Sequence, residues 1–250
     1  MSHRAGTVLR VKILATSAGG FQQGDAGFGT MKPGSIIDFA FELAGAPERP
    51  RICALMTAMG DAAGIISRWY DAFAGSDVRA SHLELFPQPN VVDPRAHLLE
   101  QDVIWVCGGS VANLLAVWRV HGLDGVFREC WESDVVLMGG SAGSICWHQA
   151  GTTDSFGPEL QPVTNGLGFI PYGNGVHYNS EERRRPTVHR LVADGTIPTT
   201  YCADDGAALY YEGTHLVEAV SDTEGAGAYL VERASDGTAT ETRIEPRFLG

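Results

Sequence analysis

The segment from Val135 to His148 constrains the fold more than any other part of the chain. It consists of an apolar run, then Gly139-Gly140-Ser141-Ala142-Gly143, then residues that favour a helix. A Gly-x-Ser-x-Gly sequence between a buried strand and a helix is typical of a nucleophile elbow, a sharp turn that exposes one serine. The glycines leave room around a strained residue, and the start of the helix directs N–H groups toward the serine oxygen. A plain strand–helix turn with a capping serine is the alternative, but the order of the elements favours the elbow.

Strand and helix signals alternate through the first two thirds of the chain. Val111, Leu114, Leu115 and Trp118 have the spacing of an amphipathic helix packed on a sheet. We also expect Ser35 to cap a helix over residues 36–43. Further strands are expected at 8–14, 51–57, 81–86 and 103–107, a glycine-rich loop at 19–29, and helices at 61–73 and 125–133. This alternation predicts an α/β fold with a mostly parallel sheet covered on both faces.

The pattern changes after residue 151. Short apolar segments at 199–203, 207–211, 215–220, 229–233 and 240–244 are separated by turn residues, as in β-hairpins. We expect one domain over residues 1–250, in which the part from about 200 to 245 adds short strands at the sheet edge.

Composition excludes several classes of function. The formal net charge of -12 disfavours nucleic acid and anionic membranes as partners, because both require a basic surface. The five cysteines include no Cys-x-x-Cys pair, which favours reduced thiols in a cytoplasmic protein. We expect no metal and no cofactor, because the histidines are scattered and the glycine-rich segment lacks the spacing of a dinucleotide or phosphate loop.

A reactive serine needs a base and an acid that orients it. His177 lies in a glycine-rich segment at 172–179 that we expect to be an irregular loop, whereas His148 lies too far along the predicted helix to reach Ser141. Two acids are candidates, Asp205 after an apolar run and Asp154 nearer to the serine. From the residues alone, His177 could equally be a loop histidine bonded to the backbone, and the Asp204-Asp205 pair could be turn chemistry.

Two backbone N–H groups are candidates for an oxyanion hole. Gly109 follows a strand that we expect beside the elbow strand, and Ala142 follows the serine. Such donors would stabilise the negative charge that develops during acyl transfer.

These motifs together resemble the serine peptidases that include dipeptidase E and cyanophycinase. The resemblance rests on the segment Gly108 to Leu115, on Gly139 to Ser144, on His177 and on Asp204-Asp205-Gly206, and it runs from the first strand to about Val220. It implies a flavodoxin-like three-layer sandwich related to class I glutamine amidotransferases.

The resemblance also implies roles for single residues. Ser141 would be the nucleophile, His177 the base and Asp205 the acid, with Gly109 and Ala142 as oxyanion donors. Asp154 lies near another acid often assigned to the relay and remains the alternative.

Dipeptidase E acts on dipeptides that begin with aspartate, which requires a cation for the side-chain carboxylate. Arg184 and Arg185 could supply it, unless the arginine run only balances Glu181 and Glu182 in solvent. This chain departs from dipeptidase E in having Ser110 after the paired glycines, where that enzyme commonly has asparagine.

The expected function is therefore a cytoplasmic serine peptidase acting on short peptides, as a monomer or homodimer. Two alternatives remain, a serine esterase or acyl transferase, and a non-catalytic binding protein with the amidotransferase-like fold. The order Ser–His–acid disfavours the esterase, because α/β-hydrolases place the acid before the histidine.

Overall fold

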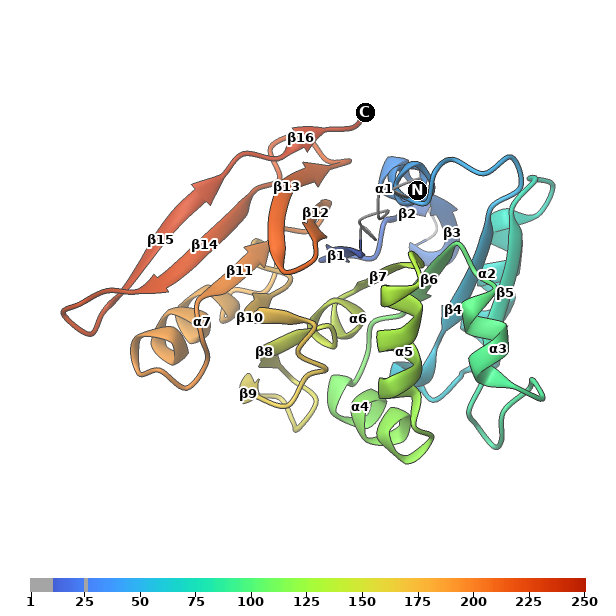
Figure 1. Cartoon of the computed structure of the whole chain (residues 1–250). Helices are drawn as coiled ribbons and strands as arrows, with labels where there is room; N and C mark the ends of the chain where they lie inside the picture. The colour runs from blue at the N-terminus through green and yellow to red at the C-terminus, as the bar shows by residue number, and fades with distance from the viewer. Residues whose placement is uncertain (1–10, 25–26) are drawn as a thin grey trace, which may run out of the picture.

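Five adjacent parallel strands form the larger part of an eight-stranded sheet in the computed structural model, which describes residues 11–24 and 27–250 (Figure 1). Their order across the sheet is β1-β7-β6-β4-β5. The bounds are Lys12–Thr16 for β1, Arg51–Leu55 for β4, Arg79–Leu83 for β5, Val103–Val106 for β6 and Val136–Gly140 for β7. β4, β6 and β7 are almost wholly buried, as expected of parallel strands covered on both faces.

Helices cover both faces of this sheet. Successive residues of β1 point to opposite sides, so Leu14 packs with α1 and α2 while Ile13 packs with α4 and α5. The helices are α1 (Ser35–Leu43), α2 (Ala63–Phe73), α3 (Pro94–Leu99), α4 (Val111–Val120) and α5 (Leu123–Glu132). The fold is therefore the three-layer α/β sandwich with a mostly parallel sheet that the sequence predicts.

Most of the strands after residue 147 form a second sheet rather than extending the first (Figure 1). Its order is β15-β14-β11-β10-β8-β9, and α7 (Arg184–Ala193) packs against it. The bounds are His148–Thr153 for β8, Gln161–Val163 for β9, Ile170–Gly175 for β10, Thr200–Ala203 for β11, Ala228–Arg233 for β14 and Ala239–Ile244 for β15.

The expectation that all late strands complete one sheet edge is therefore wrong. Only β12 (Ala207–Glu212), β13 (His215–Ser221) and β16 (Arg247–Phe248) join the first sheet, where β12 pairs with β1. An alternating pattern shows that a segment is a strand, but it does not show which sheet the strand joins.

The N-terminal part of the chain differs from the predictions at two places. Ser35 does not cap α1, because Gly34 is the N-cap and the Ser35 hydroxyl donates to the carbonyl of Gly250 at 2.9 Å. The glycine-rich segment at 19–29, expected as a loop, contains β2 (Phe21–Gly24) and the start of its antiparallel partner β3 (Gly27–Pro33). Part of the strand expected at 8–14 and residues 25–26 lie outside the described residues.

The amphipathic helix was predicted correctly. α4 spans Val111–Val120, and its four stripe residues are fully buried.

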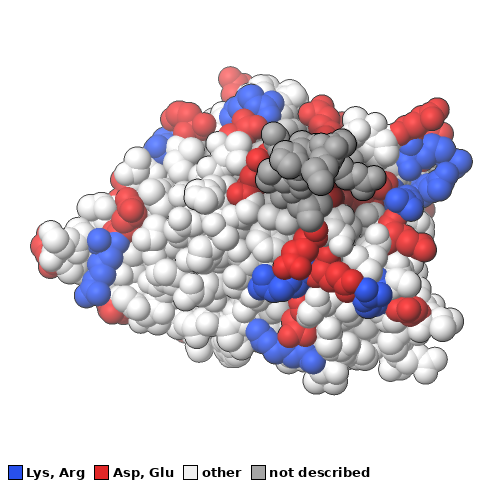
Figure 2. Space-filling model, in the orientation of Figure 1, with Lys and Arg blue, Asp and Glu red and all other residues white. Residues whose placement is uncertain are grey.

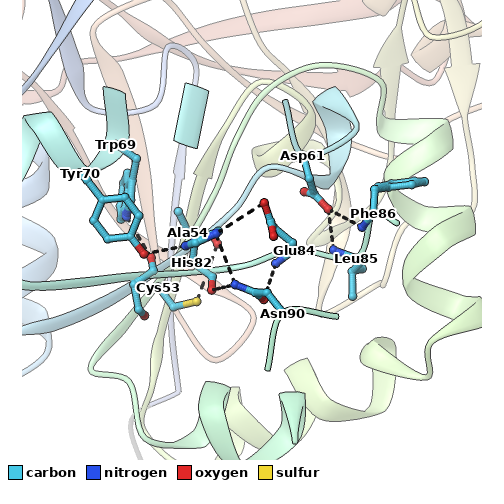
Figure 3. Close-up of polar contacts among 11 residues, drawn as sticks. Cys53, Ala54, Asp61, Trp69, Tyr70, His82, Glu84, Leu85, Phe86 and Asn90 are labelled. Atoms are coloured by element: carbon cyan, nitrogen blue, oxygen red, sulfur yellow. Dashed lines mark hydrogen bonds and ion pairs between the residues drawn. The ribbon is translucent and has the colours of Figure 1, made fainter. Parts of the chain in front are cut away.

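A polar network fixes the segment after β5 (Figure 3). Asp61 accepts the N–H groups of Leu85 and Phe86 at 2.6 and 3.1 Å, and His82 lies between Tyr70 and Asn90. Asp61 also ends the turn after the short 3₁₀ helix η1 (Thr57–Met59), since its N–H donates to the carbonyl of Met56. This network therefore holds η1, whose Ala58 carbonyl accepts the N–H of Ser110.

Charged side chains of both signs are interspersed with large uncharged areas on the face shown in Figure 2. No helix within residues 11–24 and 27–250 is long and apolar enough to cross a membrane. All five cysteines are free and buried.

Candidate active site

Ser141 lies at the turn between β7 and α6 (Ala142–Ile145), as the elbow motif predicts. Its backbone angles, φ 54° and ψ -116°, are strained for a residue with a side chain. Its N–H donates to the carbonyl of Ser17 at 2.8 Å, which anchors the turn to the end of β1.

The helix after the elbow is shorter than expected. α6 ends at Ile145, and His148 begins β8 instead of continuing the helix. Gly143 allows α6 to lie close to β6, because a Cβ at this position would stand 2.2 Å from the carbonyl oxygen of Val106. His148 is fully buried, with Nδ1 2.9 Å from the carbonyl of Ser144, and burial lowers its pKa to about 4. It does not take part in the cleft.

His177 follows β10 after one intervening residue, Val176. The segment at 172–179, expected as an irregular loop, is a strand up to Gly175. Gly173 makes room there for Thr200 of the neighbouring β11, because a Cβ at this position would stand 2.2 Å from the Thr200 hydroxyl. His177 itself has φ 53°, and its N–H donates to the hydroxyl of Ser17 at 2.6 Å. Nδ1 of the ring lies 2.7 Å from Oδ1 of Asp205. This contact leaves Nε2 as the nitrogen that can face a substrate.

The carboxylate of Asp205 is held by three side chains. Besides His177, Ser17 donates its hydroxyl proton to Oδ1 at 2.7 Å, and Ser180 donates to Oδ2 at 2.5 Å. Burial opposes ionisation of Asp205, but these hydrogen bonds outweigh it and hold the pKa well below its usual range.

The neighbouring Asp204 and the alternative acid Asp154 have other surroundings. Asp204 is buried and accepts the N–H of Gly227 at 2.8 Å and the hydroxyl of Tyr229 at 3.2 Å. Asp154 is exposed and makes no hydrogen bond with His177 among the described residues.

A cleft of about 540 Å³ brings most of the predicted residues together. We call it the Ser141 cleft. It is lined by Gly109, Ser110, Ser141, Asp154, Ser155, His177, Ser180, Glu181 and Arg184. Within the described part of the chain, no hydrogen bond joins the Ser141 hydroxyl to the imidazole, although such contacts are often longer before substrate binds.

Gly109 follows β6, which pairs with the elbow strand β7 as predicted, and it lines the same cleft as Ser141. Its φ is 131°, and a Cβ there would stand 2.4 Å from the carbonyl oxygen of Ala58 in η1. The N–H of Ser110 donates to the same carbonyl at 2.9 Å, whereas the N–H of Gly109 has no acceptor among the described residues. The N–H of Ala142 is at the first position of α6, where no intrahelical acceptor exists.

The two candidate arginines have different positions. Arg184 is 4% exposed and lines the Ser141 cleft, and its Nη1 donates to the carbonyl and hydroxyl of Thr152. Its Nε is buried without an acceptor, and burial lowers its pKa. The interpretation of a solvated charge run is therefore wrong for Arg184.

Arg185 does not line the Ser141 cleft. Its guanidinium is bonded to Glu241 and lies 4.5 and 4.6 Å from the ring centres of Tyr178 and Tyr229. Its charge is thus directed toward β15 rather than toward Ser141.

The sequence did not indicate that Ser17, Asn179 and Ser180 contact Asp205. The side-chain oxygen of Asn179 accepts the N–H of Asp205 at 2.9 Å. Ser17 could have been suspected, because it directly follows β1 and the carboxyl ends of parallel strands meet at one edge of a sheet. The other two lie in a turn whose contacts only the folded chain reveals.

Comparison with known families identifies the family of this chain. The sequence pattern of peptidase family S51 matches residues 14–219, which include every residue that lines the cleft. The chain belongs to peptidase family S51. It is therefore a peptidase, and the resemblance seen in the sequence motifs is confirmed.

Relatives of this chain are also named as peptidases. The chain is 40% identical over 240 residues to an uncharacterized peptidase, YgaJ, of Bacillus subtilis (strain 168), which covers 96% of this chain and 99% of the relative. It is 31% identical to peptidase E of Shewanella amazonensis over 134 residues, about half of each chain.

Solved structures show the same fold. A peptidase from an acI-B1 actinobacterium superposes with a TM-score of 0.64 at 16% identity, over 95% of both chains. A putative peptidase E protein from Listeria monocytogenes EGD-e gives a TM-score of 0.61 at 15% identity, over 86% of this chain and 100% of the other.

Proposed function

We propose that this peptidase hydrolyses short peptides by a serine mechanism with Ser141 as nucleophile, His177 as base and Asp205 as the acid that orients it. The observation that carries the proposal is the 2.7 Å contact between His177 Nδ1 and Asp205 Oδ1 at the cleft that also contains Ser141. An Nδ1–H that donates to the carboxylate leaves Nε2 unprotonated and able to accept a proton.

The reaction proceeds in two stages. Nε2 of His177 takes the hydroxyl proton as Ser141 Oγ forms a bond to the scissile carbonyl carbon, and the oxyanion is bound by the N–H groups of Gly109 and Ala142. The carbon–nitrogen bond then breaks, and the imidazolium gives its proton to the leaving amine. Water loses a proton to the same imidazole as it attacks the acyl-enzyme, and the proton returns to Ser141 when the acid product leaves.

Charges in the cleft favour short peptides with an N-terminal aspartate. The second terminal nitrogen of Arg184 makes no hydrogen bond within the described residues, so it is available for a substrate carboxylate. Asp154 lies exposed in the same cleft without contacting His177, and we assign it to the substrate's α-ammonium group instead of the relay.

The five free buried thiols favour the cytoplasm as the location. We propose that the protein acts there on peptides as a monomer or homodimer, without nucleic acid or membrane as a partner.

The first experiment compares the wild type with Ser141→Ala and His177→Ala on a panel of Asp-x, Asn-x and Ala-x dipeptides and on p-nitrophenyl esters. We expect cleavage of peptides by the wild type alone, and covalent labelling of Ser141 by a fluorophosphonate, located by mass spectrometry. Ser81→Ala, on β5, is the matched control for loss of a partly buried hydroxyl. Equal peptide hydrolysis by the wild type and Ser141→Ala would refute the mechanism, and ester hydrolysis without peptide hydrolysis would favour the esterase.

The second experiment tests specificity with neighbouring arginines. Arg184→Gln should lower the preference for Asp-x over Asn-x by roughly 30-fold, or about 2 kcal/mol, through loss of one charged hydrogen bond. Arg185→Gln, which removes a charge outside the cleft, should leave the preference unchanged. The same loss in both variants would contradict the role of Arg184.

A further inference from the structure

One buried residue contacts all three members of the proposed relay. Ser17 follows β1, is fully buried and does not line the Ser141 cleft. Its hydroxyl donates to Asp205 Oδ1 at 2.7 Å and accepts the N–H of His177 at 2.6 Å, and its carbonyl accepts the N–H of Ser141 at 2.8 Å.

These contacts tie together segments that are far apart in the sequence. Ser141 follows β7 in the first sheet, whereas His177 and Asp205 follow β10 and β11 in the second. Ser17 therefore joins the nucleophile of one sheet to the base and acid of the other.

The hydroxyl of Ser17 both donates and accepts in these contacts. Its one proton goes to the carboxylate, and one of its two lone pairs binds the N–H of His177. A methyl group can do neither. Without the hydroxyl, the strained backbone of His177 at φ 53° loses an anchor, and Oδ1 of Asp205 keeps only the imidazole as donor.

We propose that Ser17 is a positioning residue of this peptidase, which fixes the imidazole of His177 and the carboxylate of Asp205 relative to Ser141 through its one hydroxyl. This inference rests on the proposed serine mechanism. It assigns Ser17 no contact with the substrate, so Ser17 acts on the rate of the chemical step and not on binding.

Ser180 allows the role of Ser17 to be compared with that of a second serine that donates to Asp205. It donates to the other oxygen of the same carboxylate but contacts neither the N–H of His177 nor that of Ser141. If donation to Asp205 alone mattered, Ser17→Ala and Ser180→Ala would have the same effect. If Ser17 joins the two sheets, Ser17→Ala has the larger effect.

The experiment measures kcat, KM and their pH dependence for the full chain and for Ser17→Ala, Ser180→Ala and Ser81→Ala. We expect Ser17→Ala to lower kcat by roughly 10- to 100-fold, as small displacements of reacting groups do. KM should stay within about twofold, and fluorophosphonate labelling of Ser141 should slow in parallel with kcat.

The acid limb of the kcat/KM profile should also move to higher pH in Ser17→Ala. A carboxylate that has lost a donor stabilises the protonated imidazole more strongly, so the neutral base is reached only at higher pH. A residue that only supported the fold would lower thermal stability without moving this limb.

Ser17→Cys, which is close in size but a weak donor, should show the same changes and serves if Ser17→Ala does not fold. A kcat within about twofold of the wild type in Ser17→Ala, or equal losses in Ser17→Ala and Ser180→Ala, would overturn the inference. Ser141→Ala separates the two hypotheses: if it retains activity, the serine mechanism fails, and if it is inactive while Ser17→Ala is unaffected, only the role of Ser17 fails.

Discussion

Acidification should destabilise this protein through His148, a histidine outside the cleft. His148 is the first residue of β8, and its ring is fully buried. Nδ1 donates to the carbonyl of Ser144 in α6, and Nε2 lies 3.4 Å from the hydroxyl of Tyr211. Burial lowers the pKa of His148 to about 4, and the hydrogen bond with Ser144 opposes that shift only in part. The folded protein therefore resists protonation at a site that binds a proton readily once the chain unfolds.

The sign and size of the effect follow from linkage. Above the unfolded-state pKa of about 6.5, neither state carries the proton and stability is at its full value. As the pH falls below that point the unfolded state gains a proton first, and stability is lost until the folded pKa of about 4 is reached. The shift predicts a loss of about 2 kcal/mol between about pH 7 and about pH 5, and about 3 kcal/mol in total.

The assay is urea unfolding of the wild type and His148→Gln across this pH range. Glutamine can still donate to the carbonyl of Ser144 but does not titrate, and all other groups are shared, so the difference between the two proteins isolates His148. We expect the wild type to lose about 2 kcal/mol more than the variant on going from about pH 7 to about pH 5. Parallel losses in both proteins would refute the reasoning.

Three substitutions test the geometry of the elbow and the relay. Asp205→Asn should lower kcat by roughly 10⁴-fold because the amide favours the wrong imidazole tautomer, and a loss below about tenfold in steady-state assays would contradict its role. Gly109→Ala should lower kcat by roughly 10²- to 10³-fold at constant KM. The new Cβ would stand 2.4 Å from the carbonyl oxygen of Ala58 and would displace the N–H donor of residue 109. An unchanged kcat would exclude this N–H as an oxyanion donor. Gly143→Ala should lower the urea midpoint, because its Cβ would stand 2.2 Å from the carbonyl oxygen of Val106, and an unaltered midpoint would show that α6 can shift freely.

Features that depend on nearby residues could be predicted from the sequence. The stripe of α4 is buried as expected, and Ser141 lies at the strained turn that its flanking glycines and apolar strand indicate. Both patterns are complete within about ten residues, so local spacing was enough to predict them.

Features that depend on distant contacts could not be predicted. The segment before His177 is rich in glycine because β10 lies against Thr200 of β11, and the sequence alone presents the same glycines as a loop. Arg184 and Arg185 are identical neighbours in the sequence, yet α7 directs one into the cleft and the other onto two tyrosine rings. Helical geometry separates adjacent side chains by about 100°, but only the packing of α7 decides which one reaches the cleft.

The position of the site follows from where the strands end. Each group in the proposed mechanism follows a strand with a parallel partner: Ser17 after β1, Gly109 after β6, Ser141 after β7, His177 after β10 and Asp205 after β11. Carboxyl ends of parallel strands meet at one edge, so a site can gather there from remote parts of the chain. The positions of the proposed base and acid depend on the register of β10 on β11, which pairs Gly175 with Cys202. A slip of one residue would turn these strands' side chains to the opposite face. In the proposed mechanism, correct pairing of the second sheet is therefore a requirement as strict as the elbow itself, although that sheet does not carry the proposed nucleophile.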